Sequence, residues 1–233
     1  MHLNAGIPNQ NFLPSWDDLE DPNVFKIVST KAAMKEADAK FISRKRAQGV
    51  PYQVSTAIDE YKDQKSGDWT IVPENSNLSS VIEQRFDTVD RELYIFDNTK
   101  MAFTANNNND TRSVPRFSQG QLMYIDSLPT SEDNRVHGRL LKAGSDHMAD
   151  DLREIKLGVK TFPQFTHKEK NCTYLLRRKQ FPLRYHNCST IHKVIGKTVD
   201  KLATQITRKV DNNKYFVWDK EMLVVLMSRV RTL

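Results

Sequence analysis

The part of the sequence most suggestive of chemistry is the stretch 180–200, QFPLRYHNCSTIHKVIGKTVD, and within it Gly196-Lys197-Thr198. Gly-Lys-Thr can end a phosphate-binding P-loop, G-x-x-x-x-G-K-[ST], whose glycines let backbone N–H groups wrap around the phosphates. That motif needs a glycine five positions before Gly196, where this chain has Ile191. A β-branched residue is poorly suited to the positive φ that a tight phosphate loop often requires. We therefore reject a P-loop here, and none of the eight glycines completes the motif elsewhere.

A metal site is the second chemistry to weigh, because histidines and cysteines gather in the same region. They are His167, Cys172, His186, Cys188 and His192. Their spacing does not match the paired C-x₂₋₄-C and H-x₃₋₅-H ligands of zinc sites, and Cys188 falls in a segment expected to be a buried strand. The sequence therefore predicts no metal site.

Charge is distributed unevenly along the chain. Residues 1–155 hold 18 Lys and Arg against 24 Asp and Glu, a balance of −6, whereas residues 156–233 hold 17 against 5, a balance of +12. Clustered Lys and Arg release condensed counterions when they bind phosphates, so a basic third of a chain is typical of binding to nucleic acid or another polyanion. A solvated basic face without a ligand has the same composition, and charge alone does not separate the two.

Length and composition bound the remaining possibilities. A chain of 233 residues with 38% hydrophobic and 27% charged residues is long enough for one large or two small globular domains. It has no apolar run of about eighteen residues and no signal-peptide pattern, so we expect no membrane association. Two cysteines are too few for a secreted disulfide framework and fit a reducing compartment, with the nucleus favoured.

The first regular elements are a strand and a helix. Residues 24–28 form a short β-rich apolar run, Ser29 and Thr30 can cap a helix, and residues 31–47 are rich in Ala, Lys, Glu and Met. This order predicts the opening of an α/β unit. The helix start can hold an anion or can simply be capped.

Later segments are shorter. Residues 59–77 are polar and are expected to form a loop, and a turn at Gly120 is expected to lead into a strand. Several short strands before residue 179 favour a small β-barrel or sheet inserted into the α/β domain. Residues 188–191 should be the end of a strand that enters a polar loop at His192 and Lys193, at the carboxyl edge of the sheet, where ligands bind in open α/β sheets.

These segments together resemble a known family. Residues 177–184 read RRKQFPLR, residues 190–193 read TIHK with Gly196 and Thr198 after them, and residues 218–231 end in SRVR. Their order and spacing resemble the second RecA-like domain of superfamily 1 helicases of the petite-integration-frequency and RecD-like branch. The resemblance implies an α/β fold, a RecA-like parallel-sheet domain of residues 24–119 and 180–233. A small β-barrel would be inserted at 120–179, and residues 1–23 would be a lead-in.

The same resemblance implies the site. Thr190, His192 and Lys193 would contact the backbone of single-stranded DNA. Gly196 would let the loop approach the nucleotide between two domains, and Arg229 would be the arginine finger that stabilises charge on the transferred phosphoryl group. The predicted nucleic-acid ligands are Thr30, Arg177, Arg178, Thr190, His192, Lys193 and Thr198.

The chain also departs from the family. Ile195 replaces the usual glutamine, Lys31 replaces the usual asparagine, and the sequence has no P-loop lysine and no Asp-Glu pair for Mg²⁺. ATP and Mg²⁺ are therefore expected only with a first RecA-like domain, in cis or in trans, and neither is expected to bind this chain alone. We expect the C-terminal motor domain of an ATP-dependent DNA helicase of repair or recombination, truncated or part of a longer protein. The alternative is a non-catalytic nucleic-acid-binding or interaction module.

Overall fold

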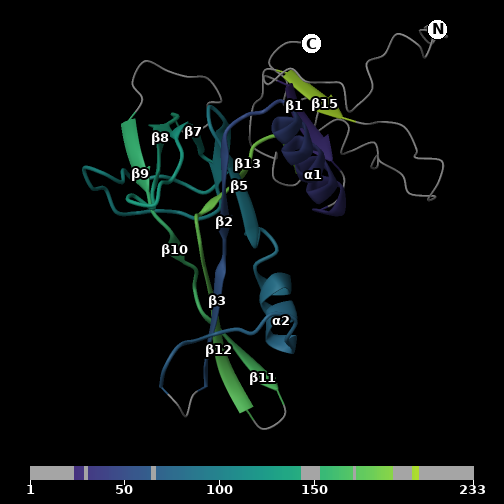
Figure 1. Ribbon diagram of the computed structural model, residues 1–233, viewed down its shortest axis with the longest axis vertical. Helices are drawn as coiled ribbons and strands as arrows, with labels where there is room; N and C mark the ends of the chain where they lie inside the picture. The colour runs from purple at the N-terminus through teal and green to yellow at the C-terminus, as the bar shows by residue number, and fades with distance from the viewer. Residues whose placement is uncertain are drawn as a thin grey trace, which may run out of the picture. The chain divides into compact units, whose positions relative to one another are not determined.

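A computed structural model of the chain describes residues 24–28, 31–63, 67–142, 153–169, 172–190 and 201–204 (Figure 1). The chain divides into two compact units. Unit 1 comprises Met1–Ala39 and Asn187–Leu233, and unit 2 comprises Lys40–His186. The predicted lead-in at 1–23 and the segment 218–231 lie outside the described residues.

Unit 1 contains a three-stranded parallel sheet in the order β14-β1-β15. Its strands are β1 (Val24–Val28), β14 (Cys188–Thr190) and β15 (Lys201–Thr204). Val28, Met34 and Cys188 form a small buried cluster between this sheet and the start of the following helix. The strand expected at 24–28 is confirmed, and the strand expected at 188–191 is observed at Cys188–Thr190.

The helix α1 (Lys31–Ala47) has the bounds that the sequence predicts. Its interior lacks Gly and Pro, and Gly49, with a φ of 70°, follows its end. Arg44, Lys45 and Arg46 occupy the last turn, where positive charge interacts favourably with the helix dipole.

Unit 2 is mainly antiparallel sheet. One sheet has the order β13-β6-β7-β8-β9, another has the order β10-β12-β3-β4 with β11 also paired to β12, and β2 pairs with β5. The strands of the first sheet are β6 (Lys100–Phe103), β7 (Leu122–Ser127), β8 (Val136–Leu140), β9 (Arg153–Leu157) and β13 (Leu183–Tyr185). Those of the second are β3 (Ile58–Asp63), β4 (Thr70–Ile71), β10 (Lys160–Thr161), β11 (Phe165–Glu169) and β12 (Cys172–Gln180). The pair is β2 (Tyr52–Thr56) and β5 (Glu92–Phe96).

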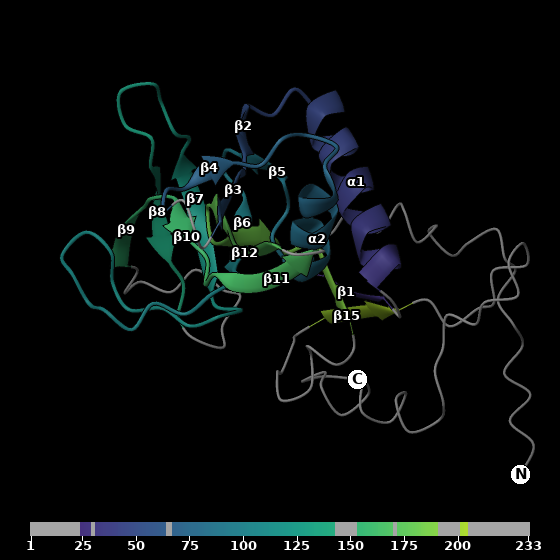
Figure 2. The ribbon, with the colours of Figure 1, turned by 90° about the horizontal axis from the view of Figure 1, so that it is seen from below.

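Two apolar clusters fill unit 2. The larger surrounds Phe103, which is fully buried and stacks on Phe117 with ring centroids 3.8 Å apart. The smaller lies beneath the helix α2 (Asn77–Arg85), where Ile82 and Phe86 pack with Leu176 of β12. The view in Figure 2 shows α2 beside β12 and β11. Burial of these side chains is the main stabilising contribution to unit 2.

The pairing in unit 2 corrects two expectations from the sequence. Within the residues that the structure describes, there is no closed barrel, and the parallel part of the fold is the three-stranded sheet of unit 1. The strands between 120 and 179 do not form a sheet of their own, because β12 pairs with β3 and β7 pairs with β6. The pairing thus joins residues that the sequence assigned to different domains.

The expected loop at 59–77 contains β3 and β4. The sequence does not predict β3 as a strand because charged residues lie on both of its faces. Asp59 points into the interior, where Arg178 neutralises it.

Among the described helices, none is long and apolar enough to cross a membrane.

Candidate nucleic-acid interface

The carboxyl edge of the parallel sheet in unit 1 is the first part of the candidate site. Val28 is in register with Thr190, and Ile27 is in register with Thr204. The three parallel strands therefore end at one edge of the sheet. Ligands of open α/β sheets bind outside such an edge.

The edge brings together chain segments that are far apart in the sequence. Thr190, which is 8% exposed, is the last residue of β14, and His192 and Lys193 are the next polar residues of the chain. Val28 ends β1 directly opposite, and Thr30 follows two residues later. The strand expected at 188–191 is observed as β14, which ends at Thr190. Six of the other predicted ligands and nucleotide contacts lie outside the described residues: Thr30, His192, Lys193, Gly196, Thr198 and Arg229.

The beginning of β14 is attached to helix α1. Asn187 donates a hydrogen bond from Nδ2 to the carbonyl oxygen of Ala37 at 3.2 Å, and the Cys188 thiol lies 3.8 Å from the carbonyl oxygen of Met34. Cys188 is 2% exposed. These contacts hold the strand that presents Thr190 against the helix that follows β1.

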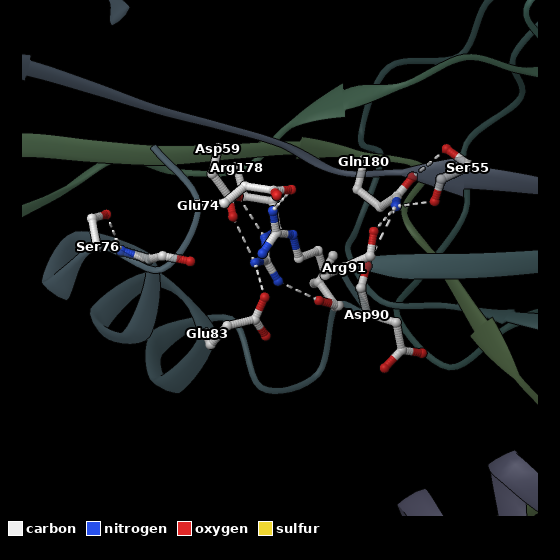
Figure 3. Close-up of polar contacts among 11 residues, drawn as sticks. Ser55, Asp59, Glu74, Ser76, Glu83, Asp90, Arg91, Arg178 and Gln180 are labelled. Atoms are coloured by element: carbon white, nitrogen blue, oxygen red, sulfur yellow. Dashed lines mark hydrogen bonds and ion pairs between the residues drawn. The ribbon is translucent and has the colours of Figure 1, made fainter. Parts of the chain in front are cut away.

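Arg178, predicted as a phosphate ligand, instead lies in the interior of unit 2 (Figure 3). Its Nε and Nη2 donate to the two carboxylate oxygens of Asp59 at 2.7 and 2.9 Å. Nη2 also donates to Glu83 at 2.5 Å, and Nη1 donates to the carbonyl oxygen of Val89 at 2.7 Å. The side chain is 0% exposed, so it has no surface with which to reach a phosphate.

The electrostatics of this cluster explain why a buried arginine keeps its charge. Burial lowers the pKa of Arg178, but hydrogen bonds to Asp59 and Glu83 outweigh it and leave the pKa above its ordinary value. The bidentate geometry with Asp59 is the strongest form of such a pair. Arg178 is thus a structural residue that joins β12, β3 and α2.

Gln180 makes a second buried polar cluster, which sequence reasoning did not find. Its side-chain oxygen accepts from the Ser55 hydroxyl at 2.7 Å and from the Phe181 backbone N–H at 2.9 Å. Its Nε2 donates to the Ser55 carbonyl oxygen at 2.9 Å and to those of Asp90 and Arg91 at 3.3 Å each (Figure 3). Arg178 and Gln180 are two positions apart, and residues at that spacing on a strand point to the same side of the sheet. This spacing is the signal that the sequence carries.

Arg177 lies on the opposite face of β12 from Arg178. Its Nε donates to Glu60 at 2.6 Å, and Lys179 donates to the other Glu60 oxygen at 2.8 Å. The guanidinium lies 3.7 Å from the centroid of the Trp69 ring. The Arg177 side chain is 22% exposed, so part of it is accessible to a ligand. The phosphate contact predicted for this residue stays a prediction.

The Glu60 carboxylate is held ionised by these two cations. Burial raises the pKa of Glu60, but the hydrogen bonds from Lys179 and Arg177 outweigh it and place the pKa below its ordinary value of 4.5.

In the part of the chain that the structure describes, no three His, Cys, Asp or Glu side chains gather in a group that could hold a metal ion.

The fold is similar to part of the Pif1 helicases. The chain matches Pif1 helicase from Candida albicans over 90% of its length with a TM-score of 0.61 and 14% identity. It matches Pif1 from Bacteroides in complex with ADP-AlF3 and ssDNA over 91% with a TM-score of 0.57 and 20% identity, and Bacteroides Pif1 bound to ssDNA over 90% with a TM-score of 0.53 and 19% identity. No protein-family model and no curated protein matches the sequence.

The similarity covers less than half of each of these helicases. The matched part is 44% of the Candida chain and 39% and 38% of the two Bacteroides chains. At this level of identity the comparison shows the fold alone. The described chain therefore has a mixed α/β, helicase-like fold that corresponds to a portion of a Pif1 helicase.

Proposed function

We propose that this chain is the second motor domain of an ATP-dependent DNA helicase. It binds single-stranded DNA at the carboxyl edge of the β14-β1-β15 sheet, with Thr190, His192, Lys193 and Thr30 as backbone ligands. The observation that supports this most directly is the register of Val28 with Thr190, because the two strands that precede the predicted ligands end side by side.

The chemistry of these residues fits the phosphate backbone. A hydroxyl, an imidazole and an ammonium group donate hydrogen bonds to phosphate oxygens without reading the bases, so contacts of this kind position a strand irrespective of sequence. The basic C-terminal third, with its balance of +12 over residues 156–233, adds electrostatic attraction. Solved Pif1 structures bound to ssDNA share the fold, which is consistent with this partner.

In this proposal ATP hydrolysis needs a first RecA-like domain. That domain supplies the phosphate loop and the Mg²⁺ ligands, which this sequence lacks. Gly196 lies near the bound nucleotide, and Arg229 is the arginine finger that stabilises negative charge on the transferred phosphoryl group. Such a residue contributes about 10³–10⁵ in rate.

The test separates DNA binding from hydrolysis. The chain is joined to a P-loop domain of a related helicase, and ATPase activity is measured with and without oligo-dT. Arg229→Ala should reduce the DNA-stimulated rate by about a thousandfold or more while DNA binding is retained. Lys193→Ala should weaken DNA binding, and unchanged binding in this variant would rule out the carboxyl-edge site.

A second candidate function is a non-catalytic nucleic-acid-binding module. It is favoured by the same basic segment together with the missing P-loop and Asp-Glu pair. This alternative predicts salt-dependent binding of the chain to single-stranded oligonucleotides without ATP, and no ATPase activity when a first domain is supplied.

A further inference from the structure

The sheet β10-β12-β3-β4 of unit 2 has one face covered and one face open. Leu176 and Arg178 of β12 point toward α2, where Leu176 packs with Ile82 and Arg178 binds Glu83. Side chains alternate along a strand, so the intervening residues of β12 point to the other side. We call that side the outer face.

Strand pairing identifies the residues of the outer face. Directly paired residues of antiparallel strands lie on the same side of a sheet. The outer face therefore includes Ile58 opposite Lys179, Glu60 opposite Arg177, and Lys62 opposite Leu175. Ile58 is 46% exposed and Ile71, opposite Glu60 on β4, is 69% exposed, so within the described residues no element covers this side.

The outer face is basic. Its charged side chains on the paired strands are Lys62, Lys168, Arg177 and Lys179 against the single carboxylate of Glu60. Glu60 already binds both Arg177 and Lys179, so one carboxylate stands against four cations on this side of the sheet. This excess of positive charge matches a polyanion.

An aromatic ring lies within the same basic surface. Trp69, which precedes β4, stacks with the Arg177 guanidinium at 3.7 Å, and Glu60 holds Arg177 in place through a 2.6 Å hydrogen bond. Stacked arginine and tryptophan planes are the groups on which unpaired bases stack in proteins that bind single strands. Because the arginine is already oriented, binding orders little additional side chain.

We propose that the outer face is a second binding surface for single-stranded nucleic acid, separate from the carboxyl edge of unit 1. Phosphates lie along Lys62, Lys168 and Lys179, and a base stacks at the Trp69–Arg177 pair. The inference rests on the proposed nucleic-acid function and extends it to unit 2. An acidic protein segment is the competing occupant, and the experiment distinguishes it.

Trp69 provides the measurement. The full chain has three tryptophans, so the double variant Trp16→Phe/Trp218→Phe retains Trp69 alone. Oligo-dT of about 12 nucleotides, within the size that single-strand binding sites cover, is titrated at low salt. Stacking of a base should quench the Trp69 fluorescence. A poly-glutamate peptide of equal charge serves as the acidic competitor and should give no comparable quenching.

Charge variants test the phosphate contacts. In the Trp69-only protein, Lys62→Ala/Lys168→Ala should lower the slope of log affinity against log salt by about 0.7 for each lysine removed. Lys142→Ala is the matched control, because Lys142 is an exposed lysine just after β8 of the other sheet and lies outside the basic segment 156–233. It should leave the slope unchanged.

The outcomes separate this inference from the proposed function. Oligo-dT binding by anisotropy without quenching of Trp69, or equal slopes for the outer-face and control variants, overturns the outer-face site. Quenching that poly-glutamate reproduces also overturns it, in favour of an acidic partner. Quenching that persists in Lys193→Ala supports the outer face, and a loss of affinity in Lys193→Ala without any effect at Trp69 supports the carboxyl edge alone.

Discussion

Replacing Arg178 by alanine should destabilise unit 2 far more than replacing its neighbour Arg177. Arg178 is fully buried and donates four hydrogen bonds, two of them to the carboxylate of Asp59. Asp59 is 8% exposed, so without the arginine its charge is buried and unpaired. Breaking a buried pair in this way costs about 3–5 kcal/mol. Arg177→Ala should cost only about 1 kcal/mol, because its side chain is partly exposed and Lys179 continues to neutralise Glu60.

The comparison is made by urea unfolding followed by circular dichroism and, independently, by thermal unfolding. For a chain of this size each kcal/mol corresponds to roughly 2–4 °C, so Arg178→Ala should lower the melting temperature by about 6–20 °C. The double variant Arg178→Met/Asp59→Leu should be more stable than Arg178→Ala, because it removes the unpaired charge along with the pair. Equal losses for Arg177→Ala and Arg178→Ala, or a double variant no more stable than the single one, would refute the reasoning.

Three further predictions concern packing and pH. Gly138→Ala should lower the urea midpoint, because a Cβ there would lie 2.1 Å from the Tyr124 carbonyl oxygen and overpacking costs about 1–3 kcal/mol. Phe103→Ala should cost about 3–5 kcal/mol in the same assay, since it empties the centre of the larger apolar cluster; a loss below about 1 kcal/mol would contradict that placement. The lowered pKa of Glu60 adds stability that is present above its ordinary value of 4.5 and is lost as pH falls through the folded-state pKa, so Glu60→Gln should weaken the acid dependence of unfolding measured between neutral and acidic pH.

Local composition is sufficient to predict the strand β1 and the helix α1. The strand at 24–28 and the helix at 31–47 depend on short-range signals, an apolar β-rich run and then good helix formers without a breaker. The sequence also predicts a strand end at 188–191, where the structure has β14 over Cys188–Thr190. The register of that strand with β1 could not be predicted, because Val28 and Thr190 are far apart in the chain and pairing depends on the whole fold.

The two adjacent arginines show what composition does not reveal. Arg177 and Arg178 look equivalent in the sequence, which predicts that both bind phosphate. In the structure strand alternation sends one to the outer face and the other to Asp59, which is 119 residues away in the sequence. A strand with a charged residue that faces the protein interior has the polar composition of a loop. For this reason the sequence predicts a loop where the structure has β3.

The discontinuity of unit 1 has a consequence for the order of folding. Unit 2 is one continuous segment, Lys40–His186, and can fold as soon as it has been synthesised. The strand β1 precedes it, and among the described strands its partners are β14 and β15, which follow it. At about 5–20 residues per second, β1 waits roughly 8–30 seconds for its partners. During that interval an apolar, β-rich segment with both edges unpaired is exposed on the ribosome, so the parallel sheet should be the last part to form and the part most dependent on chaperones.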